Sequence, residues 1–419
     1  MTFKANTLSS LHRTLPVHSS CLDVSDFAPY FYTLYPKRYR PSPPAFTDIW
    51  QRYFPQSHCY PTPTGRYALW YFLEHCAFPT GSEVLVSAYN YYVVVRILVQ
   101  KGLKPVFVDI DPATLSMDPA DMARKITANT RLALVTHMFG IPADMDSIQT
   151  LCTIHHLKLF EDCAHALGSS HQGTQVGSNA CGALFSFGIA KITNSLGGGM
   201  LVMTSSDGFS LPRHQPTTPL SHFDSSIRLG ITLVSAPVSY RWLMAPLVNL
   251  AATLAEHGHT TLRNFVAQSK NDAFYRFDEG ARPAYKEFMT AMQARQVARL
   301  DANIARRRHI AATIKAAIQN ISALRLLNED CFGEWNASYL GLYADDKEAL
   351  AKHLRKLGVS CNTQEFFDCA DLAQFSEFSA HCPQAQYASN HLLRLPNYPD
   401  LSDADITHII NSIQKFYSR

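Results

Sequence analysis

A lone lysine, Lys191, separates an apolar run from a glycine-rich stretch in the segment FSFGIAKITNSLGGGM. The run ends at Phe187 and has the composition of a buried strand, and the glycines would let the backbone approach a ligand closely. A lysine amine that forms an imine needs a partly desolvated site, whereas most lysines near a strand end are solvated surface residues. Ser186 could offer a hydroxyl to a phosphate. Taken alone, Lys191 fits an ordinary surface residue better than a catalytic one.

An acidic residue and a histidine follow another apolar run, in LKLFEDCAHALG. Asp162 stands at the end of the predicted strand, where a carboxylate could hold a protonated ring nitrogen. His165, three residues later, could reach a neighbouring oxygen. The alternative is that Asp162 caps the following helix and His165 is a satisfied polar residue at the sheet edge. The segment by itself favours neither interpretation.

A third candidate is the segment PTPTGRYALW, which has the form of a turn that opens a helix. Backbone N–H groups at a helix N-terminus bind phosphate, although many helices begin with Thr-Gly for capping reasons alone. The chain has neither a P-loop nor a GxGxxG motif after its first strand. Tyr91, at the end of the next predicted strand, could stack on a flat ring or belong to the core.

These residues must be positioned by a regular alternation of strands and helices that begins near residue 60. Such an alternation predicts right-handed crossovers, an α/β fold and a mostly parallel central sheet flanked by helices. Ligands of open α/β sheets bind at the carboxyl ends of the strands. In chain order, the segments are helix GRYALWYFLEHCA, strand EVLVS, helix YYVVVRILVQKG, strand PVFVDI, helix DPADMARKI, strand LALVTHMF, helix DMDSIQTLCTIHH, strand LKLFED, and strands ALFSF and MLVM.

The 419 residues suffice for more than one core, and we predict three parts. An irregular N-terminal arm rich in Pro and Tyr, without recognisable chemistry, covers 1–59, and a large domain covers 60–295. A smaller C-terminal α+β domain covers 296–419. Within the large domain, an apolar insertion of about 206–284 interrupts the alternation, and one long amphipathic helix is predicted from AMQARQ to IKAAI.

Composition excludes several classes of protein. The 37 basic and 34 acidic residues give a net charge of +3, so there is no electrostatic basis for nucleic-acid binding. The ten cysteines form no CxxC pair and are typical of reduced, mostly buried thiols in a cytosolic protein. The N-terminus lacks the apolar run of a signal peptide, and no stretch reaches the roughly 18 apolar residues of a membrane-spanning helix. We therefore expect a cytoplasmic protein without a bound metal.

Taken together and in this order, the motifs resemble the DegT/StrS family of aminotransferases that depend on pyridoxal 5'-phosphate (PLP). The resemblance covers about 60–205 and 285–419. It includes PVFVDIDPATLSMDP, HMFGIPADMD, EDCAHALGSSHQGTQVGS and LLRLPNYPDLSDADI. It implies the aspartate-aminotransferase fold, known as fold type I, and a PLP cofactor.

The resemblance also implies roles for single residues. Lys191 matches the lysine that holds PLP as a Schiff base and then moves the substrate proton. Asp162 matches the carboxylate on the pyridinium nitrogen, and His165 lies near the phenolic oxygen. Tyr91 matches the stacking aromatic and Ser186 a phosphate contact. The phosphate loop corresponds to Gly65, Arg66 and Tyr67.

Three features depart from the family pattern. Arg66 replaces a small hydroxyl residue and could contact a phosphate or bind an acidic substrate group. Lys286 replaces the Asn that reaches the cofactor of the partner subunit, so the resemblance implies a homodimer with shared sites. The insertion is longer and more apolar than the usual connection. It could be a packing element, or 227–257 could contact a membrane or a lipid-like substrate.

The function that follows from the resemblance is transamination, with an amino donor such as glutamate and a ketone or aldehyde acceptor, by default a nucleotide-linked keto sugar. An acceptor that is lipid-like or has a long chain is an alternative. A PLP- or PMP-dependent sugar dehydratase is another, but family members of that kind carry His in place of the lysine. A non-catalytic PLP-binding regulator is the last, and it would not need Lys191, Asp162 and Ser186 together.

Overall fold

The computed structural model describes residues 15–19, 22–34, 45–206, 208–211, 285–364 and 366–418. The segment 227–257, for which a membrane or lipid contact is predicted, lies outside these residues, as does most of the predicted insertion 206–284.

The central feature is a seven-stranded sheet with the order β1-β10-β9-β6-β5-β2-β4. Five neighbouring strands are parallel. At one edge β10 runs antiparallel to both of its neighbours, β9 and β1, so β1 has the same direction as the five. The predicted α/β fold with a mostly parallel sheet is confirmed. The strands are β1 (His58–Thr62), β2 (Glu83–Ser87), β4 (Lys104–Val108), β5 (Thr130–Thr136), β6 (Lys158–Asp162), β9 (Gly182–Ser186) and β10 (Gly199–Met203).

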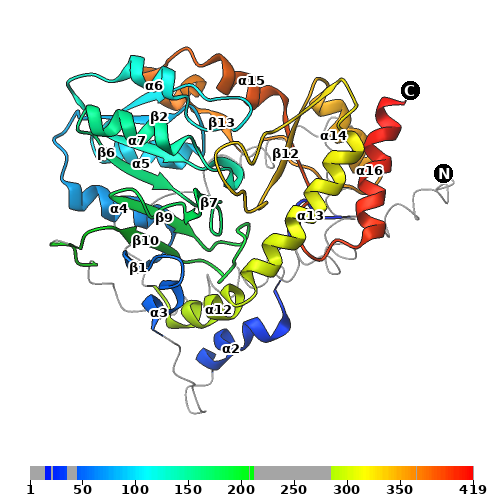
Figure 1. Cartoon of the computed structure of the whole chain (residues 1–419), viewed down its shortest axis with the longest axis horizontal. Helices are drawn as coiled ribbons and strands as arrows, with labels where there is room; N and C mark the ends of the chain where they lie inside the picture. Colours follow the sequence, from blue (N-terminus) through cyan, green and yellow to red (C-terminus); the bar gives the residue numbers. More distant parts are fainter. Residues whose placement is uncertain are drawn as a thin grey trace, which may run out of the picture.

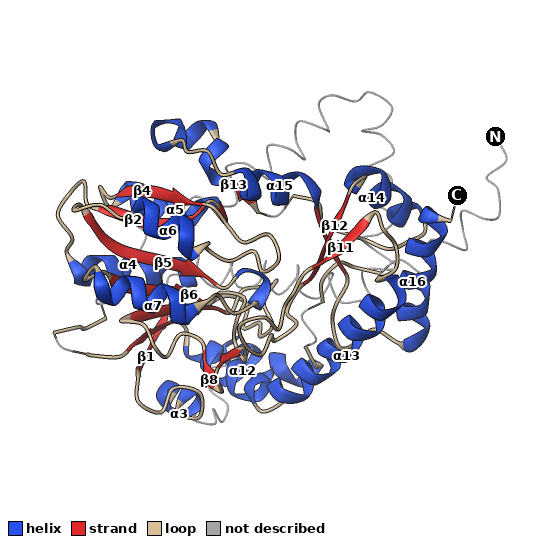
Figure 2. Cartoon of the chain, turned by 45° about the horizontal axis from the view of Figure 1, so that its top comes forward, coloured by secondary structure: helices blue, strands red, loops and turns tan. Residues whose placement is uncertain are grey.

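Helices cover both faces of this sheet (Figures 1 and 2). The faces alternate along each strand: Leu134 packs with α4 (Gly65–Cys76) and α5 (Tyr92–Gln100), whereas Val135 packs with α6 (Pro119–Lys125) and α7 (Met145–Ile154). Asp118 and Asp144 start α6 and α7 by accepting hydrogen bonds from backbone N–H groups of the first turn. The sequence-predicted alternation of strands and helices is thus present.

A smaller sheet lies in the C-terminal part, beside the last helices (Figure 1). Its three antiparallel strands have the order β11-β12-β14. A two-stranded pairing of β13 (Phe367–Asp368) with β3 (Tyr89–Asn90) links this part to the large sheet. The elements are β11 (Leu324–Leu326), β12 (Leu340–Ala344), α14 (Lys347–Lys356), η4 (Cys369–Asp371), η5 (Ala373–Phe378), α15 (Pro383–His391), β14 (Leu392–Leu395) and α16 (Asp403–Tyr417).

The single long helix expected before this sheet is divided into α12 (Glu287–Val297) and α13 (Leu300–Ile318). Arg299 has non-helical dihedral angles (φ −110°, ψ 2°), and its guanidinium bonds Asp26 at 2.6 Å. An ion pair with a distant segment therefore competes with continuation of the helix at Arg299. The periodicity of the sequence gives no sign of a break at this position. The prediction of one uninterrupted helix was wrong.

The N-terminal arm is more regular than its composition suggests. It contains η1 (Val24–Phe27), α2 (Ala28–Leu34), α3 (Phe46–Trp50) and the beginning of β1. Trp50 is fully buried and stacks on Phe187 with ring centroids 5.2 Å apart. Burial of aromatic surface thus orders an arm that we expected to be irregular. The proposed boundaries at 59 and 295 stay predictions.

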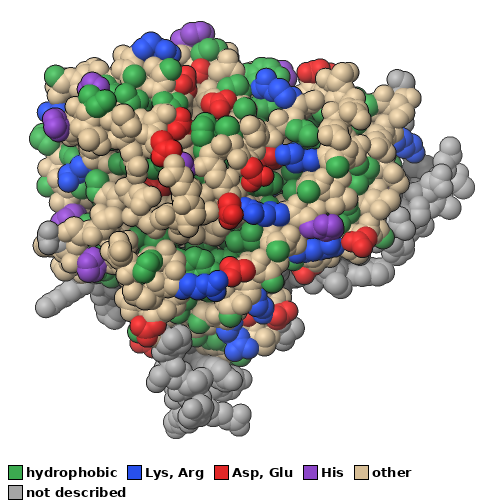
Figure 3. Space-filling model, viewed as in Figure 1, with side chains coloured by type: hydrophobic (Ala, Val, Ile, Leu, Met, Phe, Trp, Pro, Cys, Tyr) green, Lys and Arg blue, Asp and Glu red, His purple; other side chains and the backbone are tan. Residues whose placement is uncertain are grey.

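Among the described residues, nine cysteines are free thiols, and Cys331 is the one exposed member of this set. No helix within the described ranges is long and apolar enough to cross a membrane. On the face seen in Figure 3, basic and acidic side chains are interspersed.

Candidate active site

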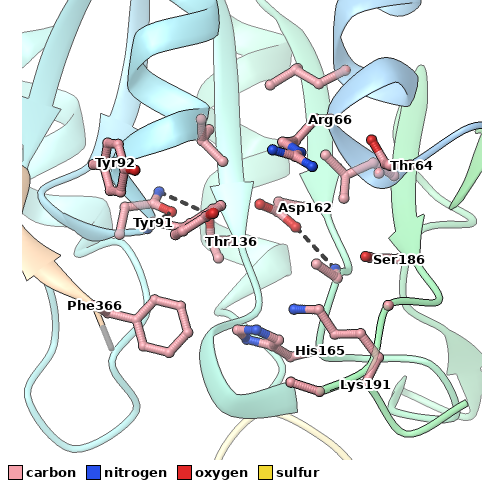
Figure 4. A pocket seen from close by; sticks show the side chains of 18 of the residues that line it. Thr64, Arg66, Tyr91, Tyr92, Thr136, Asp162, His165, Ser186, Lys191 and Phe366 are labelled. Carbon is pink, nitrogen blue, oxygen red and sulfur yellow. Dashed lines mark hydrogen bonds between the residues drawn. The ribbon is translucent and has the colours of Figure 1, made fainter. Parts of the chain in front are cut away.

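A cavity of about 570 Å³ lies at the carboxyl ends of β5, β6 and β9. It brings together segments that are far apart in the sequence, and Figure 4 shows their side chains around one space. Of the sequence-predicted residues, those that line it are Gly65, Arg66, Tyr91, Asp162, His165, Ser186 and Lys191. Residues that sequence reasoning missed also line it, among them Thr64, Asn90, Thr136, Gln364 and Phe366.

Asp162 is the last residue of β6 and its side chain is 5% exposed. One carboxylate oxygen accepts a hydrogen bond from the backbone N–H of Ala164 at 3.0 Å. Burial raises the pKa of Asp162, and the nearby positive charge of Lys191 opposes this rise. A cationic partner inside the cavity would offset the cost of ionising this buried carboxylate.

His165 lies between two aromatic rings at the wall of the cavity. Its imidazole meets the edges of Tyr339 and Phe366, with ring centroids 4.7 and 5.2 Å away. Burial, together with the charges of Lys191 and Arg394, holds the pKa of His165 well below its usual range. The imidazole is therefore neutral at physiological pH and can donate or accept one hydrogen bond at each nitrogen.

Lys191 is half-buried on the loop that follows β9, and its side chain points into the cavity beside His165 (Figure 4). Its backbone N–H donates to the carbonyl of Gly188 at 3.0 Å, which closes a tight turn. The return to β10 uses positive φ angles at Leu196 (62°), Gly197 (133°) and Gly198 (88°). The two glycines adopt such angles at little cost, so the chain can turn from the lysine loop into β10.

The other end of the cavity is built by the start of α4. Thr64 is the N-cap of this helix, and its buried hydroxyl oxygen has no hydrogen-bond partner among the described residues. A Cβ atom on Gly65 would lie 3.2 Å from the Cβ of Ser186, so the helix start and the end of β9 are in contact. The first turn of α4, the hydroxyls of Thr64 and Ser186 and the Arg66 guanidinium thus line one space, which suits a phosphate.

The donors and shape of this cavity fit PLP. The helix start offers an anion site at one end, and the buried carboxylate of Asp162 stands ready for a ring nitrogen. Lys191 places an amine in the same cavity, beside His165 (Figure 4), and Tyr91 supplies an aromatic surface. Asn90 fixes the local backbone, because its side-chain amide donates to the Thr136 hydroxyl at 3.1 Å and its oxygen accepts from the Tyr91 N–H at 2.7 Å.

Two sequence-predicted residues do not line this cavity. Tyr67 is buried in the core and its backbone N–H donates to the carbonyl of Thr64, so that N–H is already used inside the protein. Lys286 is the N-cap of α12, next to Tyr285, whose ring would lie 3.4 Å from a Cβ atom on Gly198. Its contact with the cofactor of a partner subunit stays a prediction.

A buried pair on the opposite face of the sheet supports the strand ends. His137 follows Thr136, Glu161 precedes Asp162, and their side chains are 2.8 Å apart. His137 Nδ1 accepts a hydrogen bond from the N–H of Ala143, so the proton of the neutral ring is on Nε2. Nε2 therefore donates a hydrogen bond to the Glu161 carboxylate. Cys163 lies near enough to complete a metal-ligand set, but the hydrogen bonds already use both imidazole nitrogens. We therefore assign this cluster a structural role.

The DegT/DnrJ/EryC1/StrS aminotransferase family model matches residues 41–209 and 247–414. The chain therefore belongs to this family of PLP-dependent aminotransferases.

Two relatives illustrate the sequence similarity. L-Glutamine:2-deoxy-scyllo-inosose aminotransferase of Streptoalloteichus tenebrarius is 35% identical over 151 residues, 36% of this chain and 36% of the relative. In that alignment the chain thus spans about a third of the relative's length. GDP-perosamine synthase of Escherichia coli O157:H7 is 26% identical over 339 residues, 81% of this chain and 80% of the relative.

A solved structure confirms the expected fold type. The E. coli GDP-4-keto-6-deoxy-D-mannose-3-dehydratase with bound hydrated PLP superposes with a TM-score of 0.71. The match covers 95% of this chain and 99% of that one at 17% identity. A dehydratase and an aminotransferase family thus share this architecture, so the fold alone does not determine the reaction.

Proposed function

We propose that this protein is an aminotransferase that transfers the amino group of glutamate, or of its amide glutamine, to a keto sugar, by default one that is linked to a nucleotide. The convergence of Lys191, Asp162 and Ser186 with the start of α4 in one cavity carries the proposal. The names of the two relatives support the substrate class, because one is named for an inosose acceptor and the other for a GDP-linked amino sugar. A volume of about 570 Å³ lies within the range of small-molecule sites.

Lys191 has two tasks in this proposal. Its amine would hold the cofactor covalently and, once the substrate's amino group has displaced it, would act as the base that removes the substrate's proton and returns it. Both tasks require a neutral amine in a partly desolvated place. The half-buried position of Lys191, beside His165 (Figure 4), supplies the partial desolvation.

Asp162 would hold the cofactor's ring nitrogen in its protonated state. When bound, PLP supplies an electron sink for the charge that develops at the substrate carbon. An anionic Asp162 maintains the positive charge that this sink requires. Burial makes the interaction strong, because few water molecules screen the carboxylate.

The remaining residues orient the cofactor. His165 would hydrogen-bond its phenolic oxygen, and Tyr91 would cover one ring face. The backbone N–H groups of Gly65 and Arg66, with the Ser186 hydroxyl and the Arg66 guanidinium, would bind its phosphate. We further propose a homodimer in which Lys286 reaches the phosphate of the partner subunit's cofactor.

Lys191 also separates the proposal from its competitors. A dehydratase of this family carries His at the lysine position, and a regulator would not need a base aimed into the cavity. The observation that favours amination is therefore the presence of Lys191 together with Asp162 in the same cavity.

The test begins with covalent attachment. Borohydride treatment of the holoenzyme followed by peptide mass spectrometry is expected to find the cofactor on Lys191, and K191A is expected to lose both this adduct and turnover. Glutamate and glutamine are then added separately, and conversion of the cofactor to its amine form is followed by absorbance. The aminated enzyme is finally offered keto sugars with and without a nucleotide. Attachment without conversion by either donor would refute transamination and leave the regulator.

A further inference from the structure

Two side chains from outside the large sheet hold consecutive carbonyls of the loop that carries Lys191. His18 Nε2 lies 2.9 Å from the carbonyl oxygen of Ile189. The hydroxyl of Tyr339 donates to the carbonyl of Ala190 at 2.8 Å. Ile189, Ala190 and Lys191 all line the cavity. The two peptide groups that precede the lysine are therefore fixed by residues at distant positions in the sequence.

His18 belongs to a short arm that the C-terminal part of the protein holds in place. The N–H of Leu15 donates to Gly358 at 2.7 Å, and the N–H of Ser360 donates back to Leu15 at 3.0 Å. Ser19 adds a hydrogen bond to Asp400 at 3.4 Å. The arm is thus anchored on both sides of His18, which limits the positions that the imidazole can take.

The protonation state of His18 follows from its surroundings. A carbonyl oxygen can only accept, so Nε2 must carry the proton. Burial and the charges of Arg307, Arg394 and Lys191 lower the pKa of His18 to about 3, so the imidazole is neutral throughout the physiological range. The hydrogen bond to Ile189 therefore persists with a neutral donor.

Tyr339 connects the same loop to His165. Its ring is 3% exposed, lies 4.7 Å from the imidazole of His165, and stacks on Phe139 at 5.4 Å. The guanidinium of Arg394 covers this ring at 4.4 Å. A tyrosine locked in this way offers its hydroxyl to Ala190 from a fixed position.

We propose that His18 is a positioning residue for Lys191, acting with Tyr339 by clamping the two peptide groups that lead into it. The inference rests on the proposed function, in which Lys191 is the attachment site and base. A loop rich in glycine can take many conformations, and a base works only when it is held near its productive geometry. The two outside donors supply this restraint. The arm around residues 15–19, although far away in sequence, is therefore part of the catalytic unit.

The test compares His18 variants that keep or remove the N–H donor at the position of Nε2. H18Q keeps an amide N–H near the position of Nε2, whereas H18L removes it. H18N, whose amide reaches only the position of Nδ1, removes the donor with a polar side chain. S19A keeps the imidazole but weakens the arm's anchor at Asp400, so it separates the effect of the anchor from the effect of the donor.

The first measurement uses the apo protein. Hydrogen–deuterium exchange of a peptide covering 187–197 is expected to accelerate about five-fold in H18L. Loss of one neutral hydrogen bond would change the equilibrium for local opening by about this factor. H18N should behave like H18L, and H18Q should stay close to wild type. S19A should accelerate exchange less than H18L, because it loosens the arm but keeps the donor. Tyr339→Phe, which keeps the ring and removes the other donor, should accelerate exchange of the same peptide.

The second measurement is the rate at which added PLP becomes attached to Lys191, trapped with borohydride at successive times. We expect H18L and H18N to be about five-fold slower than wild type and H18Q to recover most of the rate. Exchange and attachment unchanged in H18L, or H18Q as impaired as H18L, would overturn the inference. If H18L does not fold, H18N decides in the same way.

K191A separates this inference from the proposed function. If K191A retains covalently attached cofactor, the proposed role of Lys191 fails, and the inference about His18 fails with it. If K191A loses the adduct while H18L and H18N match wild type, only the role of His18 is refuted.

Discussion

A Cβ atom on Gly199 would lie 2.4 Å from the backbone nitrogen of Gly65. The first residue of β10 thus touches the first turn of α4, and the bridge between Thr64 and Gly198 extends this contact. Because the two nearest atoms belong to the backbone of Thr64 and Gly65, rotation of a side chain cannot make enough room. The end of the lysine loop and the proposed phosphate site are therefore assembled as one unit.

This contact predicts that Gly199→Ala weakens the phosphate end and the fold together. Overpacking of this kind costs about 1–3 kcal/mol, and the helix start must shift. We expect a lower melting temperature and faster loss of PLP on dialysis. Gly188→Ala is the matched control for apo stability, because the nearest atom to its Cβ would be the Ser186 hydroxyl at 3.9 Å. Equal melting temperatures for the two variants would contradict the prediction.

Arg66 is expected to strengthen cofactor binding through its side chain. A charge-assisted hydrogen bond to phosphate contributes about 1.5–3 kcal/mol, so Arg66→Ser should weaken PLP binding about ten-fold or more. Titration of the apo protein with PLP, followed by absorbance, measures the change. Arg124→Ser is a surface control, since the Arg124 side chain is 67% exposed. If R66S binds PLP normally but loses affinity for an acidic substrate, Arg66 serves the substrate instead.

If Lys286 reaches the cofactor of the partner subunit, two inactive variants should complement each other in a mixed dimer. If each site combines Lys191 of one subunit with Lys286 of its partner, a mixed dimer of K191A and K286A has one intact site and one doubly altered site. Co-expression with two different tags and tandem purification should therefore recover about half of the wild-type activity per dimer, whereas K286A alone is impaired at every site. Activity no higher than the mean of the two mutant homodimers would exclude a shared site.

Asp368 predicts a pH-dependent stability. Burial, with the charges of Asp371 and Asp109, raises the pKa of Asp368 from 3.8 to about 6. The folded protein therefore keeps a proton that the unfolded chain loses, and the stability of wild type should fall relative to Asp368→Asn as the pH rises from about 4 to about 6. The asparagine oxygen can still accept from the N–H of Ala370, at 3.1 Å in wild type.

We expect Asp368→Asn to be more stable than wild type above pH 6 by about 1 kcal/mol, allowing for water near the carboxylate. Urea unfolding at several pH values measures this difference. Asp371→Asn should move the transition to lower pH by removing one of the repelling charges. A stability difference that is constant between pH 4 and pH 7 would rule out this explanation.

Local patterns in the sequence determined the sheet. The runs predicted to end at Asp162 and Phe187 became β6 and β9, which end at Asp162 and Ser186, because period and turn residues are short-range signals. Chain order and right-handed crossovers then placed their carboxyl ends at one edge. The candidates Asp162, His165, Ser186 and Lys191 could therefore be named, and the structure places all four around one cavity.

Only the tertiary structure decided which distant residues complete the site. His18 lies 171 positions from Ile189, and Tyr339 lies 149 positions from Ala190. No periodicity links such pairs, because their contact depends on how the arm and the small sheet pack against the lysine loop. The break at Arg299 has the same origin, since its partner Asp26 belongs to the arm. Short-range patterns thus determined the strands and the reactive residues, and long-range packing determined the contacts that hold the lysine loop.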